Sequence, residues 1–217
     1  EGFPADLPDF LWGIALNNEK AWFEARRDDY ERCLHGPVKA LAWQVLEALG
    51  EKFPREPLSP HISRIYRDAR NLRGRGPLND HMWFSIGRTG RVYAQEPQFF
   101  FGVEARCCSW GLGFWNAGAE IMDRWRKSID VNPQRLSRIV GTVNRMEGME
   151  RYGDTYKRPK GDPGPLLFDW YNARMPGVER TLWFDGGLPG PELADVISSD
   201  FIKLMPLYRY LTELGGD

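Results

Sequence analysis

The sequence predicts an α+β fold, with a mostly antiparallel sheet in the middle of the chain covered by N-terminal and C-terminal helices. Apolar residues recur at helical spacing towards both ends of the chain. Between them, β-branched and aromatic residues form runs that are typical of strands. These runs follow one another without intervening helices, which favours an antiparallel sheet over a doubly wound parallel one. There is no repeat or long linker, so we expect one domain spanning residues 1–217.

The first quarter is predicted to be helical. Apolar residues at i, i+3, i+4 and i+7 indicate a helix from Leu7 to Ile14. A second helical segment, Glu19 to Leu34, is expected to end at Gly36-Pro37. The helical period then resumes from Val38 to Leu49, and the prolines between residues 54 and 60 indicate a stiff loop.

Strand-forming residues follow in the middle of the chain. We predict strands at 61–68 and at Met82–Ile86, and a hairpin or meander made by 99–103 and 106–110. Glycines at positions 111 and 113 then permit a bend or bulge close to another backbone.

The second half of the chain is predicted to contain both helices and strands. Helices are predicted from Asn116 through Ile129 and from Asn132-Pro133 to Val143. Strands at 152–157 and 178–184 enclose a short helix at 166–173. A last helix, 193–214, is expected to break at Pro206.

Composition excludes several broad classes of protein. Twenty-nine basic and 30 acidic residues leave a net charge of −1, so nucleic-acid binding ranks last and any anion site must be local. No apolar run approaches the roughly 18 residues of a membrane helix. Three cysteines, including the vicinal pair Cys107-Cys108, suit a reducing compartment, and we expect a cytoplasmic protein. Nine tryptophans indicate a bulky core or an aromatic cleft.

The segment 63–77 is the strongest functional signal, because it contains five arginines and one carboxylate. If it were extended, Arg64, Tyr66, Asp68 and Arg70 would project from one face, and the guanidinium groups would keep Asp68 ionised. The glycine-rich loop that follows would let a ligand approach its arginines closely. A structural Arg–Asp–Arg network explains the segment equally well.

Two further polar turns and one tryptophan complete the candidate site. Asn17 and Asn18 could close one side of a cleft, although helix capping explains them better. A basic turn at 157–160 could supply more cations, although it reads as a solvated loop when taken alone. The predicted ligand-binding residues are Arg64, Tyr66, Arg67, Asp68, Arg70, Arg73, Arg75, Asn17, Asn18, Trp115, Lys157, Arg158 and Lys160.

Other chemistries have little support in the sequence. The three histidines, His35, His61 and His81, share no ligand spacing, so we assign neither a metal nor another cofactor. There is no Gly-x-Ser-x-Gly elbow or phosphate-binding loop. Cys107 and Cys108 are expected to pack in a strand region and not to act as activated thiolates.

The order of several segments resembles the uncharacterised family known as domain of unknown function 2461. Asn17–Phe23 is similar to its opening, and Ile62–Arg70 to its most characteristic motif. Similar residues continue at Gly111–Trp115, Arg158–Gly161 and the closing Pro206–Leu211, so the resemblance spans nearly the whole chain. It implies no function.

One loop departs from that family's pattern. The family typically continues with Phe-Ser-Lys-Asp-Lys-Thr-Pro-Tyr-Lys, where this chain has residues 71–79. The aspartate is replaced by Gly74, the tyrosine by Leu78 and the final lysine by Asn79. If the family has a catalytic acid in this loop, this chain lacks it.

Three functional hypotheses follow. The first is a binding module for a small anionic or phosphorylated ligand, held between the arginine segment and the basic turn. The second is a hydrolase or transferase with Asp68 as general base, although neighbouring arginines should lower the pKa of Asp68 and make it a poor base. The third is an interaction module that uses exposed aromatic residues. The sequence carries no indication of oligomeric state.

Overall fold

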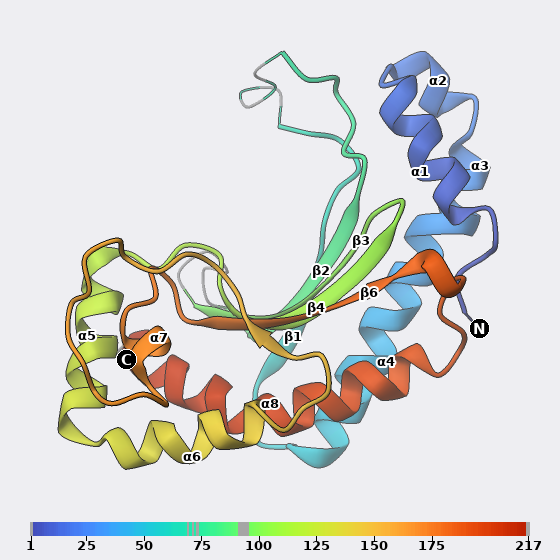
Figure 1. Ribbon diagram of the computed structural model, residues 1–217. Helices are drawn as coiled ribbons and strands as arrows, with labels where there is room; N and C mark the ends of the chain where they lie inside the picture. The colour runs from blue at the N-terminus through green and yellow to red at the C-terminus, as the bar shows by residue number, and fades with distance from the viewer. Residues whose placement is uncertain (1, 69, 71, 73, 91–95, 216–217) are drawn as a thin grey trace.

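The computed structural model describes residues 2–68, 70, 72, 74–90 and 96–215, and a six-stranded antiparallel sheet lies at its centre (Figure 1). The strand order is β1-β2-β3-β4-β6-β5. The strands are β1 (Leu58–Ile62), β2 (Met82–Arg88), β3 (Pro97–Val103), β4 (Cys107–Phe114), β5 (Glu150–Arg151) and β6 (Gly177–Trp183). The helices are α1 (Leu7–Leu16), α2 (Lys20–Glu24), α3 (Arg27–Tyr30), α4 (Gly36–Lys52), α5 (Ala119–Val131), α6 (Pro133–Val143), α7 (Phe168–Tyr171) and α8 (Leu193–Gly215). The predicted α+β fold is confirmed.

The expected break at Gly36-Pro37 is wrong. A π-helical turn, Glu31–His35, carries α3 directly into α4. Pro37 lies in the first turn of α4, directly after the π-helical turn, and its fixed φ suits the helical backbone there. A Cβ at Gly36 would lie 2.6 Å from the carbonyl oxygen of Glu31, so glycine is what allows the helices to join.

The prediction of a strand at 61–68 is also wrong for most of that range, because only residues 61 and 62 belong to a strand. The strand is β1, which ends at Ile62 and includes Pro60. Because β1 is an edge strand, its proline need not donate to a neighbouring strand. After β1 the chain folds back on itself: Arg67 N donates to Pro77 O at 2.8 Å, and Asn79 N donates to Ile65 O at 2.7 Å. The arginine segment thus forms its own small loop beside the sheet.

Elsewhere the differences are smaller. β2, β3, β4 and β6 lie close to the predicted positions, as do α5 and α6. Gly111 and Gly113 lie within β4 and do not interrupt it. The strand expected at 152–157 is reduced to an isolated bridge between Thr155 and Ala173, preceded by the two-residue β5. α8 continues through the exposed Pro206, because its buried neighbours Met205 and Leu207 hold the helix on the core.

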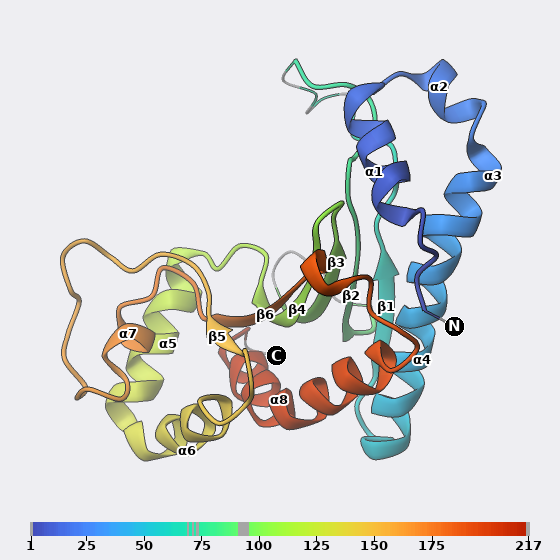
Figure 2. The ribbon, with the colours of Figure 1, turned by 45° about the vertical axis from the view of Figure 1, so that its right-hand side comes forward.

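The core lies on one face of the sheet, against α4 and α8. Figures 1 and 2 show these two long helices on the convex side of the curved sheet. Phe99 of β3 stacks between Phe201 and Tyr208 of α8, with ring centroids 4.7 and 4.8 Å away. Because side chains alternate across a strand, the neighbours of these core residues point to the opposite, concave face.

Candidate functional site

A row of paired residues crosses the concave face of the sheet. Ser85 of β2 lies opposite Phe100 of β3, which lies opposite Gly111 of β4; Gly111 in turn lies opposite Glu179 of β6. Gly111 carries no side chain, and a Cβ there would overlap the carbonyl oxygen of Val178, so glycine lets β4 and β6 approach closely between Phe100 and Glu179. The row therefore forms a floor with a hydroxyl at one end and a carboxylate at the other.

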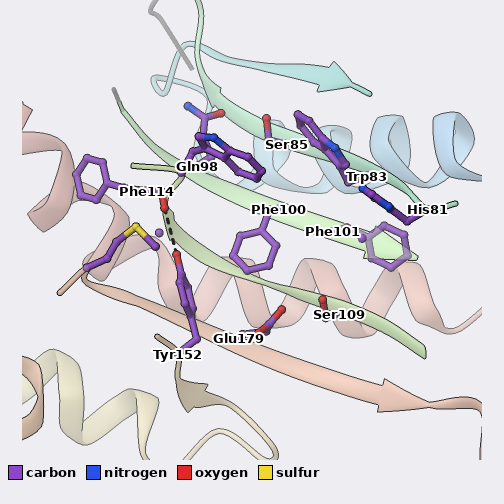
Figure 3. A pocket seen from close by; sticks show the side chains of 14 residues that line it. His81, Trp83, Ser85, Gln98, Phe100, Phe101, Ser109, Phe114, Tyr152 and Glu179 are labelled. Atoms are coloured by element: carbon purple, nitrogen blue, oxygen red, sulfur yellow. Dashed lines mark hydrogen bonds between the residues drawn. The ribbon is translucent and has the colours of Figure 1, made fainter. Parts of the chain in front are cut away.

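Aromatic rings surround this floor and enclose a cavity of about 400 Å³ (Figure 3). Trp83 and Trp115 stack with centroids 6.3 Å apart, and the rings of Phe100 and Tyr152 meet nearly at right angles at 6.0 Å. The described residues that line the cavity are His81, Trp83, Ser85, Gln98, Phe100, Phe101, Gly102, Ser109, Gly113, Phe114, Trp115, Tyr152, Met175 and Glu179. A mostly apolar lining with a few polar groups is typical of small-molecule sites.

Tyr152 reaches the cavity from outside the sheet. It follows β5, and its hydroxyl donates to the carbonyl oxygen of Phe114 at 3.3 Å. Its ring lies on Gly113 and Gly177, which are paired across β4 and β6; a Cβ on either glycine would overlap the tyrosine. Burial, together with the nearby charge of Glu179, raises the pKa of Tyr152. Tyr152 is thus a neutral, fixed wall of the cavity.

The hydroxyl of Ser85 lacks a hydrogen-bond partner among the described residues. Ser85 is 3% exposed, and its Oγ is buried. A buried polar atom without a partner usually marks an unseen water or ligand, because leaving such a group unpaired costs about 1–3 kcal/mol. Ser85 lies on the cavity floor, so this unmet hydrogen bond belongs to the cavity.

The arginine segment is divided among several local interactions. Arg67 is mostly buried and donates to Asn79 Oδ1 and Asp80 Oδ1, both at 3.1 Å. The Tyr66 hydroxyl donates to Glu24 at 2.8 Å. Arg64 is exposed, and its carbonyl oxygen accepts from Asn79 Nδ2. These bonds are mainly structural, in line with the network alternative.

Among the described residues, Asp68 pairs with Arg70. Its carboxylate accepts from Arg70 Nη2 at 2.6 Å and also from the Arg70 backbone N–H. These bonds lower the pKa of Asp68 to about 2, so it is a weak base near neutral pH. The Arg70 side chain is 87% exposed, and Arg75 is also exposed. Arg73, a further predicted ligand residue, lies outside the described residues.

The two asparagines have structural partners. Asn17 Nδ2 donates to Gly13 O at 3.0 Å, at the C-terminal end of α1. The Asn18 side chain makes two bonds with the backbone of Leu78: Nδ2 donates to its oxygen at 2.9 Å, and Oδ1 accepts from its nitrogen at 2.8 Å. Asn18 thereby attaches the turn between α1 and α2 to the chain that directly follows the arginine segment.

A second cavity, of about 500 Å³, lies between α2 and the arginine segment. Lys20, Arg27 and Arg67 contribute cationic groups to its wall, beside Tyr66 and Glu24. Arg27 is already paired with Glu24 at 3.3 Å. This cavity therefore brings together two of the predicted residues, Tyr66 and Arg67, in a cationic setting.

The basic turn lies far from the arginine segment. Figures 1 and 2 place the chain between β5 and α7 in the lobe formed by α5 and α7, at the opposite end of the sheet from α1 and α2. There Lys160 Nζ lies 4.9 Å from the ring centroid of Tyr156, while Lys157 and Arg158 are exposed. The expected cleft between the arginine segment and the basic turn does not form. Trp115, the remaining predicted residue, lies at the sheet cavity instead.

Two kinds of site are not seen in the described part of the chain. No three His, Cys, Asp or Glu side chains come close enough together to hold a metal ion. Of the helices that the structure describes, none combines the length and apolarity that a membrane crossing needs.

Sequence reasoning found only Trp115 of the residues around the sheet cavity. The alternation of Trp83 and Ser85 with Met82 and Phe84 was a usable signal for a two-faced strand. The position of Tyr152 was not accessible in this way, because it depends on how the β5 segment packs on Gly113 and Gly177.

Comparison with known proteins places the chain in a family. Residues 6–210 of the 217 match the family described as "Conserved hypothetical protein (DUF2461)", so the chain belongs to that family. A comparison with curated proteins gave no match. The expected resemblance is thereby confirmed, and the assignment of a function depends on the site itself.

Proposed function

We propose that this protein binds a small organic molecule with a flat, mainly apolar body in the cavity on the concave face of the sheet. The observation that carries the proposal is the buried hydroxyl of Ser85, which has no hydrogen-bond partner among the described residues and lies on the floor of an aromatic cavity. A volume of about 400 Å³ lies within the range of small-ligand sites. The stacked rings of Trp83 and Trp115 offer a surface for the flat body, and Ser85 offers a specific hydrogen bond.

This proposal is testable with a neutral aromatic probe whose fluorescence rises in apolar surroundings, N-phenyl-1-naphthylamine. We expect saturable binding to the full chain, weakened about tenfold by Trp115→Ala, because one aromatic contact contributes about 1–1.5 kcal/mol. The matched control is Trp43→Ala, since Trp43 is also exposed but lies on α4. Equal affinities of the two variants, or no saturable binding, would contradict the proposal.

A second candidate function is binding of a small anionic or phosphorylated ligand in the cavity beside the arginine segment. Lys20, Arg27 and Arg67 on its wall favour it, because guanidinium and ammonium groups suit phosphate and carboxylate. Inorganic phosphate should then raise the melting temperature of the wild type and not that of Arg67→Ala. A phosphate effect that persists in Arg67→Ala would exclude this cavity as the site.

A further inference from the structure

The charge of the sheet cavity is opposite to the charge that an anion-binding site would need. Of the described residues that line it, none is a lysine or an arginine, and Glu179 is the acidic one. Glu179 is partly buried at the end of the floor, beside Phe100 and Tyr152 (Figure 3). A single carboxylate among aromatic rings makes the potential in the cavity negative.

A second carboxylate adds to this potential. Glu150 of β5 lies directly opposite Glu179 of β6, and side chains paired in this way point to the same face of the sheet. Like charges placed opposite each other destabilise a strand pair. Arg151 lies beside them, but its guanidinium donates to the carbonyl oxygens of Tyr152 and Gly153, each at 3.0 Å. These acceptors are neutral, so Arg151 keeps its positive charge, and Glu150, Glu179 and Arg151 together carry one net negative charge that a bound cation would balance.

The aromatic walls favour the same kind of ligand. The faces of aromatic rings carry partial negative charge and attract cations, most strongly where water is excluded. The Phe100 and Tyr152 rings stand 6.0 Å apart at an interplanar angle of 85°, so they form two sides of a corner. Glu179 stands next to that corner, because Gly111, its partner on β4, lies opposite Phe100 of β3.

We infer that the ligand of the sheet cavity carries an alkylated ammonium group, held in the corner of Phe100 and Tyr152 against the carboxylate of Glu179. This inference rests on the proposed function and names the chemical class of the ligand at the same site. The rest of the ligand extends along the floor towards Ser85, whose hydroxyl supplies the hydrogen bond. The shared chemistry suits either a free quaternary amine or a methylated lysine side chain.

The test compares choline with 3,3-dimethylbutan-1-ol, a neutral molecule of the same shape in which carbon replaces the nitrogen. Calorimetric titration of the full chain should show choline binding about tenfold more tightly, because the two ligands differ only in the charge. Glu179→Gln should remove most of this preference and leave the affinity for the alcohol within about twofold. Glu47→Gln, an exposed carboxylate on α4, is the matched control and should change neither affinity.

The outcomes separate this inference from the proposed function. Equal affinities for choline and the alcohol, or binding of the naphthylamine probe without binding of choline, would overturn the cation and leave the cavity as a ligand site. Failure of all three ligands would overturn both. If choline binds, comparison with N-acetyl-trimethyllysine N-methylamide identifies the source, since tighter binding of the amide indicates a methylated side chain and tighter binding of choline a free amine.

Discussion

Replacing Phe99 by alanine is expected to lower the free energy of unfolding by about 4 kcal/mol, because it leaves a cavity between β3 and α8. The Phe99 ring is fully buried and stacks on both Phe201 and Tyr208. The same change at the next residue, Phe100, should cost only about 1 kcal/mol, because that side chain points to the open face and is partly exposed. Urea unfolding of the two variants measures both values.

This pair of neighbours also separates stability from ligand binding. Phe100→Ala should weaken binding of the naphthylamine probe about tenfold while the fold remains intact. Similar losses of stability in the two variants would mean that the concave face is part of the core. That result would remove the physical basis of the sheet cavity.

The second large effect is expected at Asp200, a carboxylate that is 4% exposed in α8. It accepts from Trp110 Nε1 at 3.0 Å and from Arg180 Nη1 at 3.3 Å. Asp200→Ala should lower the free energy of unfolding by about 3–4 kcal/mol, because it leaves both donors without their acceptor.

Two comparisons identify the cause of that loss. Asp200→Asn should cost about half as much, because the amide oxygen can still accept from the indole of Trp110. Asp195→Ala changes an exposed aspartate of the same helix and should stay within about 0.5 kcal/mol of the wild type. Thermal unfolding of the three variants distinguishes these values. An Asp200→Ala protein as stable as Asp195→Ala would show that the buried pair does not hold α8 on the sheet.

The fold was largely predictable, because the two periodicities of the sequence reflect what each element buries. Trp125 and Ile129 at helical spacing are fully buried in α5, and the alternation of β2 is that of a strand with two different faces. The errors fell where backbone partners decide the structure. Residues 63–68 have the composition of a strand, and Ser63 still donates to Trp83 O of β2. Beyond it, Ile65 and Arg67 bond to Asn79 and Pro77, so the segment leaves the sheet.

The candidate site was less predictable for a related reason. The arginines of the segment 63–77 were predicted to form a site because their charges are close together in the sequence. In the structure, Arg67 forms an ion pair with Asp80, and Arg70 forms one with Asp68. The sheet cavity instead collects single residues from separate strands, such as Ser85 and Glu179, whose register no local pattern reveals.

The most direct test of the account is an NMR titration of the tryptophan indole N–H groups. The nine tryptophans can be assigned by single Trp→Phe variants. Addition of N-phenyl-1-naphthylamine should shift the signals of Trp83 and Trp115, which line the sheet cavity, and leave Trp43 on α4 unchanged. Shifts confined to Trp22, in the helix beside the arginine segment, or no shifts at all, would contradict a ligand site on the concave face of the sheet.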